Sequence, residues 1–265
     1  MPEDANYYDR FSNHNEEPIK EKKNREVVSG TAFSLAKVFT YMFGGLLITS
    51  VIALALGYFI SYLFGISSTE DTETLLVGVV ALLIISAIAL IVMSFVVPIM
   101  AVRNRHSVLI PSIIYTILMG IMLSTITAFI PWYILGITFG ITSLIFGLMA
   151  LIALLSKSRL NGLAIAAIGL VVGAMFLSLI LFILMITGVM TGELVGLYWA
   201  ITLITFAAMM LITIWDMARI KRIAAQGEMS KNLSLYCAFI LYNDFINILL
   251  RVLRIVLMIM AKSKK

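Results

Sequence analysis

Long apolar runs separated by short polar stretches make up the chain from about residue 30 onward. Each run reaches the length of about 17–25 residues that a helix needs to cross a bilayer. Because hydrocarbon offers no partners to backbone N–H and C=O groups, we expect each run to be helical. The pattern predicts seven spans, near residues 37–64, 75–102, 108–130, 132–155, 163–189, 194–217 and 233–260.

The first 29 residues differ from the rest of the chain, since they are polar, charged and without periodicity. This composition is typical of disordered segments. No apolar stretch comes before Leu35, so we expect no cleavable signal peptide and interpret the first apolar run as a retained span. The predicted organisation is a disordered cytoplasmic tail at 1–29 and a seven-helix transmembrane domain at 30–265.

Composition strengthens the assignment to membranes. Hydrophobic residues make up 62% of the 265 residues and charged residues 12%, against about 45–50% and about 25% in soluble domains. The predicted fold class is therefore an all-α polytopic membrane protein. The net charge of +5 does not indicate nucleic-acid binding, because the basic residues form small groups between apolar runs. The single cysteine, Cys237, excludes a disulfide framework.

The loops predict the orientation of the chain, because Lys and Arg favour the cytoplasmic side. The loops after spans one, three and five contain no Lys or Arg, which places the N-terminus inside and the C-terminus outside. The tail lysines Lys262, Lys264 and Lys265 then lie on the unfavoured side. Either the loops outweigh them, or the last segment does not fully cross. The basic residues of the other loops are Arg103, Arg105, Lys157, Arg159, Arg219, Lys221, Arg222 and Lys231.

Two carboxylates lie within the predicted spans, Asp216 in TIWDMARIKR and Asp244 in LYNDFINILLR. Charges at membrane depth often mark ion or proton pathways. At 100° per residue, Arg251 lies about 20°, Asn247 about 60° and Asn243 about 100° from Asp244. We predict that Asn243, Asn247 and Arg251 line a pore. A polar face inside a membrane must be covered by protein or water, so the last helix is expected at the centre of the bundle.

The turn between spans six and seven predicts the depth of both aspartates. In GEMSKN, Gly227 would stop one helix, and Ser230 or Asn232 would cap the next. Counted from this turn, both Asp216 and Asp244 lie about 15 Å along their helices. The pair could share a proton, because two neighbouring carboxylates do not easily both ionise. It could also act as a metal site that takes up a hard cation such as calcium.

Arginines near the two aspartates could either gate an ion route or form purely structural ion pairs. Arg103 or Arg105, at the cytoplasmic end of span two, could pair with one aspartate and close the route. The alternative is a purely structural network, with Asp216 paired to Arg219. Asp244 would then bind Arg251 or polar groups on a neighbouring helix.

At these motifs the sequence resembles the Bax inhibitor-1 family (transmembrane Bax-inhibitor-motif proteins), most strongly in SLYCAFILYNDFINILLRVLRI and WDMARIKR. The resemblance implies a seven-helix fold with a central last helix and a pH-sensitive calcium leak. It implies a proton-sharing pair at Asp216 and Asp244, and a latching arginine at Arg103 or Arg105. It favours a bacterial-type member in a bacterial plasma membrane. Some bacterial members carry a glutamate within span two, and this sequence has no acid there.

Two functional hypotheses follow. The first is a calcium-permeable leak channel or transporter gated by protonation of the aspartate pair, with calcium and protons as its partners. The second is a membrane regulator that binds other membrane proteins, such as a quality-control protease, through EEPIKEKKNREV in the tail. We expect no tightly bound cofactor and no enzymatic activity, because HExxH and GxSxG are absent and the two histidines, His14 and His106, lie in the tail and a loop.

Overall fold

The computed structural model consists of seven α-helices joined by short connections, and it describes residues 5–66, 69–103, 107–156, 161–186, 195–227 and 229–263. Each predicted span has its helix, and the predicted bounds 132–155 are those of α4. The helices are α1 (Ala5–Ile66), α2 (Thr69–Arg103), α3 (Leu109–Phe129), α4 (Trp132–Leu155), α5 (Asn161–Ile186), α6 (Val195–Ala225) and α7 (Lys231–Ser263).

Within the described residues, five helical stretches are long and apolar enough to cross a membrane. The chain is therefore a helical, multi-pass membrane protein. A shorter apolar stretch, Ile165–Ile180, lies in α5, and α7 is not among the five. The charges of Asp244, Arg251 and Arg254 lower the hydropathy of α7. The five stretches are Gly30–Ile66, Asp71–Ala101, Leu109–Phe129, Trp132–Leu155 and Trp199–Ala225.

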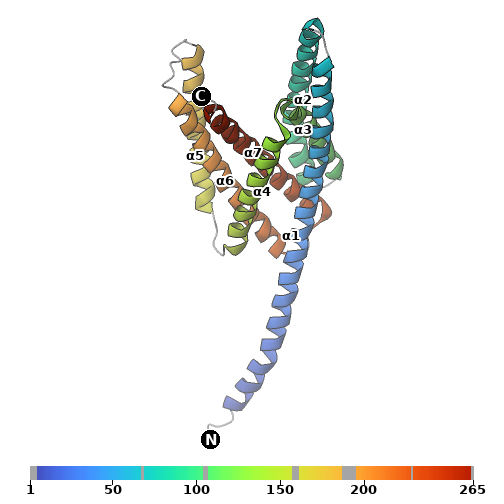
Figure 1. Ribbon diagram of the computed structural model, residues 1–265. Helices are drawn as coiled ribbons and strands as arrows, with labels where there is room; N and C mark the ends of the chain where they lie inside the picture. Colours follow the sequence, from blue (N-terminus) through green and yellow to red (C-terminus); the bar gives the residue numbers. More distant parts are fainter. Residues whose placement is uncertain are drawn as a thin grey trace.

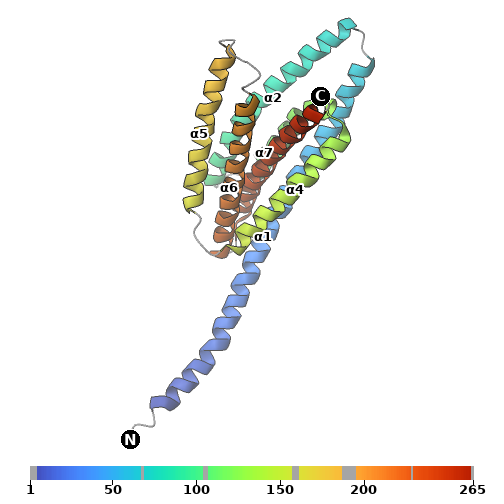
Figure 2. The same cartoon turned by 60° about the vertical axis from the view of Figure 1, so that its left-hand side comes forward.

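The start of α1 differs from the predicted tail. The helix begins at Ala5, whereas the candidate span within it begins at Gly30. A helix that is already nucleated extends at the gain of one hydrogen bond per added residue, and the Glu and Lys residues of this segment are good helix formers. In Figures 1 and 2 this part of α1 runs away from the other helices. The boundary near residue 30 stays a prediction.

The helices pack around α7 from several sides. α7 contacts α1, α4 and α6, and to a smaller extent α2 and α3. Its side chains contribute heavily to the buried core, with Leu241, Tyr242, Phe245 and Ile248 all at most 2% exposed. α5 packs against α6 on the side away from α7 (Figure 2).

Close approach of α1 and α3 depends on glycine. A Cβ added at Gly120 of α3 would lie 2.8 Å from the Cβ of Ile52 and 3.0 Å from the carbonyl oxygen of Thr49, both on α1. A Cβ at Gly57 of α1 would collide with Thr127 of α3. Small residues that let backbones come together are the usual basis of tight helix packing in membranes. Gly57 and Gly120 therefore permit the close approach of α1 and α3.

The connection between α6 and α7 has the predicted turn. α6 ends at Ala225, and Gly227 follows with a φ of 144°, which only glycine adopts without strain. Ser230 caps α7, because its hydroxyl oxygen accepts from the Leu233 N–H at 3.2 Å. Of the two predicted caps, Ser230 is therefore the one used.

A lysine links the end of α6 to the end of α4. The Lys221 ammonium donates to the carbonyl oxygens of Leu154, at 2.5 Å, and Ser156, at 3.1 Å. These carbonyls lack partners within their own helix, and a cation there also complements the helix dipole. The C-terminal ends of α4 and α6 therefore lie on the same side of the bundle, as the alternating charges of the loops predict.

Candidate functional site

The two aspartates of the predicted spans lie together inside the bundle. Asp216 of α6 and Asp244 of α7 are each 9% exposed. Their carboxyl groups are close enough for their charges to interact. The two groups come from α6 and α7, which are in contact.

Thr213 of α6 is a second polar neighbour of Asp244. The Asp244 carboxyl group lies within hydrogen-bonding reach of the Thr213 hydroxyl. That hydroxyl also donates to the carbonyl oxygen of Met209 at 2.9 Å. A hydroxyl carries a single proton, so Thr213 can donate either to the Met209 carbonyl or to the Asp244 carboxylate.

The second oxygen of Asp244 stands out among the described polar groups. Oδ2 is buried and has no hydrogen-bond partner there. A buried polar atom without a partner is costly, and native proteins keep few of them. An unsatisfied carboxyl oxygen beside a second carboxyl group provides a place for a proton or a cation.

Asp216 has a cation nearby, on its own helix. The charge of Arg219, one turn further along α6, acts on Asp216. The Arg219 guanidinium is exposed and lies over the Trp215 ring, 5.5 Å from its centroid. Cys237 of α7 is within electrostatic reach of both Asp216 and Arg219. The predicted alternative pairing of Asp216 with Arg219 therefore has a basis in the structure.

The predicted gating arginines are Arg103 and Arg105. Arg103 ends α2 and its side chain is exposed. Arg105 lies outside the described residues. The cation that acts on Asp216 in this structure is Arg219. A gating role for Arg103 or Arg105 stays a prediction.

The predicted pore-lining residues divide by exposure. Asn243 and Arg251 are half-buried, and Asn247 is exposed. Only Asp244 of the expected polar face is fully buried. Positions 60–100° apart on one helix meet different neighbours, and the described side chains around Asn247 leave it exposed.

A hydrogen-bonded link on the other side of α7 from Asp244 was not predicted from the sequence. The Tyr242 hydroxyl lies 2.6 Å from Oγ1 of Thr49, and Thr49 donates to the carbonyl oxygen of Thr116 at 3.0 Å. Because the Thr49 proton is used in that bond, Tyr242 is the donor to Thr49. The link joins α7 to α1 and α3. The sequence does contain one indication of it, because Tyr242 lies in an apolar span and a buried tyrosine needs a partner for its hydroxyl.

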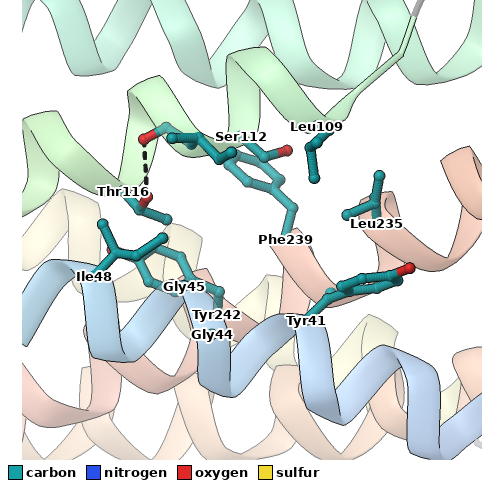
Figure 3. A pocket seen from close by; sticks show the side chains of 12 residues that line it. Tyr41, Gly44, Gly45, Ile48, Leu109, Ser112, Thr116, Leu235, Phe239 and Tyr242 are labelled. Atoms are coloured by element: carbon teal, nitrogen blue, oxygen red, sulfur yellow. Dashed lines mark hydrogen bonds between the residues drawn. The ribbon is translucent and has the colours of Figure 1, made fainter.

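A small pocket of about 180 Å³ adjoins this link, between α1, α3 and α7 (Figure 3). Gly45 of α1 makes room for the Tyr242 ring, because an added Cβ would lie 3.3 Å from it. The hydroxyls of Ser112 and Thr116 in the pocket each donate to a carbonyl of their own helix at 2.8 Å, the latter along the dashed line of Figure 3. The pocket therefore presents mainly apolar surface.

Comparison with known families identifies the chain. It matches the family described as "Inhibitor of apoptosis-promoting Bax1" over residues 32–263. The chain belongs to this family. The match begins just after the predicted tail and contains both aspartates, so the resemblance seen in the sequence motifs is confirmed. Among curated proteins, none matches the chain.

Proposed function

We propose that this Bax inhibitor-1 family member is a pH-sensitive calcium leak channel or transporter, gated by protonation of Asp216 and Asp244. The observation that carries the proposal is the buried Asp244 carboxyl group, which interacts with Asp216 and has one oxygen without a partner among the described groups. Membership of the family adds support. The proposal assigns transport to this site, and no catalysis.

The chemistry of the pair provides the switch. At low pH one proton or two neutralise the carboxyl groups, and the site has little attraction for a cation. At higher pH both groups ionise and repel each other, and a cation relieves the repulsion. Calcium takes six to eight oxygen ligands, so two carboxylates with water would hold it weakly. Weak binding suits an ion that must leave again.

The proposal also includes the wider architecture. Seven spans would surround a central α7, with the N-terminus in the cytoplasm of a bacterial cell and the protein in its plasma membrane. Asn243, next to Asp244, and Asn247 and Arg251, further toward the C-terminal end of α7, would line the route. Arg103 or Arg105 would engage Asp216 in a closed state that differs from the arrangement described above.

Calcium flux into proteoliposomes tests the proposal. Wild-type protein should give flux that changes across a pH range of about 5–8. Asp216→Asn and Asp244→Asn should each change the pH dependence, because the remaining carboxyl group titrates without a carboxylate neighbour. Glu73→Gln removes an exposed carboxylate at the start of α2 and serves as the control. Unchanged flux and pH dependence in both aspartate variants would overturn the mechanism.

A second candidate function is regulation by contact with other membrane proteins, such as a quality-control protease. The observation that favours it is the first part of α1, which runs away from the bundle in Figures 1 and 2. Deletion of residues 1–26 separates the two functions. Loss of partner capture with intact calcium flux supports this second role, and unaltered capture counts against it.

A further inference from the structure

An apolar groove of about 560 Å³ lies between α1 and α4. Buried side chains of α7 form its floor, with Phe245 at 2% and Ile246 at 3% exposure. Its rim is open, since Leu47 of α1 is 67% and Trp132 of α4 is 83% exposed. Both walls, α1 and α4, contact α7. The volume falls within the range of about 300–1,000 Å³ that is typical of ligand pockets.

The groove has almost no polar groups to offer. Its lining contains no charged residue and four residues with hydroxyls. Three of these hydroxyls already donate within the protein: Thr49 to the Thr116 carbonyl, Thr127 to the Ala53 carbonyl at 2.7 Å, and Thr138 to the Ile134 carbonyl at 2.7 Å. A ligand held here gains mainly dispersion and hydrophobic contact. The apolar lining of the groove therefore favours a hydrocarbon ligand.

The position of the groove indicates the source of that hydrocarbon. Its α1, α3 and α4 walls lie within candidate membrane spans. The open rim thus faces bilayer tails rather than water. Trp132 lies at the start of α4, next to the short connection from α3, and exposed tryptophans concentrate at the level of lipid headgroups. A tail entering beside Trp132 keeps its headgroup at the membrane surface.

We propose that this groove binds one acyl chain of a bilayer phospholipid, with Trp132 beside the glycerol region and Phe245 and Ile246 beneath the chain. The site is independent of ion flux. Since Phe245 and Ile246 follow Asp244 directly on α7, the bound chain packs against the turn of α7 that carries the carboxylate.

Gly136 allows the groove to be filled without a clash. It lines the groove, and a Cβ added there meets no atom within 4 Å. Gly136→Leu therefore places a side chain in the space of the acyl chain. Gly147 lies on the same helix outside the groove and also has open space around it. Gly147→Leu is thus the matched control for added apolar bulk.

Native mass spectrometry of detergent-purified protein, titrated with a synthetic phosphatidylcholine, measures the binding. We expect wild type and Gly147→Leu to retain one phospholipid and Gly136→Leu to bind it at least about tenfold more weakly. Equal retention by all three proteins would overturn the site. A change in the monomer–dimer ratio of Gly136→Leu without loss of phospholipid would assign the groove to a second copy of the chain, and would also overturn it.

Fluorescence quenching in wild-type protein tests the groove without relying on the folding of the Gly136→Leu variant. Phosphatidylcholine with brominated tails is titrated into delipidated wild type in detergent, and Trp fluorescence is recorded. Quenching should saturate near one equivalent, and the saturable part should be absent from Trp132→Phe. Linear quenching without saturation, or a saturable part that survives in Trp132→Phe, contradicts binding in this groove.

Discussion

The hydroxyl of Tyr242 donates to Oγ1 of Thr49 across 2.6 Å, and this bond ties α7 to α1 only two residues before Asp244. At 100° per residue, Tyr242 and Asp244 lie about 160° apart on α7. One side of the helix is thus anchored to α1 while the other presents the carboxylate to α6. The bond holds the rotation of α7 and so helps to set the direction of Asp244.

The direction of this bond predicts unequal effects of removing its two members. Thr49→Val leaves the buried Tyr242 hydroxyl without an acceptor, which should cost about 1–3 kcal/mol of stability. Tyr242→Phe leaves Thr49 bonded to the Thr116 carbonyl and should cost about 1 kcal/mol. Denaturant unfolding in mixed micelles measures both free energies. The double variant should lose less than the sum of the two, and a greater loss in Tyr242→Phe would reverse the assigned donor.

The close contact between α1 and α3 predicts that alanine at Gly120 and alanine at Gly140 have different effects on stability. Gly120→Ala would place its Cβ 2.8 Å from that of Ile52. Such crowding should lower the free energy of unfolding by about 1–3 kcal/mol. Gly140→Ala, on α4, adds a methyl group to open space and should be neutral or slightly stabilising, because alanine favours the helix. Equal stability of the two variants would contradict the close packing of α1 on α3.

How far the sequence predicted this structure depends on which property is considered. Apolar length alone predicted the seven helices, because the thickness of the bilayer sets that length. Counting from Gly227 placed Asp216 and Asp244 at one level, because the rise of a helix is constant. The bond of Tyr242 to Thr49 was beyond such reasoning. Which faces of distant helices meet is decided by side-chain packing across the whole bundle, and no local period encodes it.

The exposure of Asn247 shows the same limit. The helical wheel placed it beside Asp244 on a face that we expected to meet protein or water. The structure buries Asp244 against α6 and leaves Asn247 exposed, since cover depends on where the neighbouring helices lie. The helical start of α1 at Ala5 was missed for another reason. Composition describes the segment by itself, and not its continuity with a stable helix.

The lone cysteine offers a direct test of the packing of α7. Cys237 is 1% exposed and packs in the core. Buried structural cysteines are unreactive, so a maleimide reagent should label the native protein far more slowly than the protein unfolded in detergent. The single thiol makes the result unambiguous, because only one position can react. Rapid labelling of native protein would contradict the placement of this face of α7 in the core.

The identity of the cation beside Asp216 gives the last prediction. Arg219 acts on Asp216 from the same helix, whereas Arg103 is exposed at the end of α2. Removing a neighbouring cation disfavours an ionised carboxylate. Arg219→Gln should therefore move the midpoint of the pH dependence of calcium flux upward. Exposed pairs are worth about 0.2–1 kcal/mol, which corresponds to a shift below about one pH unit.

Arg103→Gln is the matched variant, since it removes one exposed positive charge from another helix. If Arg219 is the cation that matters, the midpoint of Arg103→Gln should stay with wild type. High salt should shrink the difference between wild type and Arg219→Gln, because exposed charges are screened. An upward shift in Arg103→Gln alone would mean that Arg103 reaches Asp216 in a second conformation. Arg103 would then be the gating residue, and Arg219, which lies over the ring of Trp215, would have no part in gating.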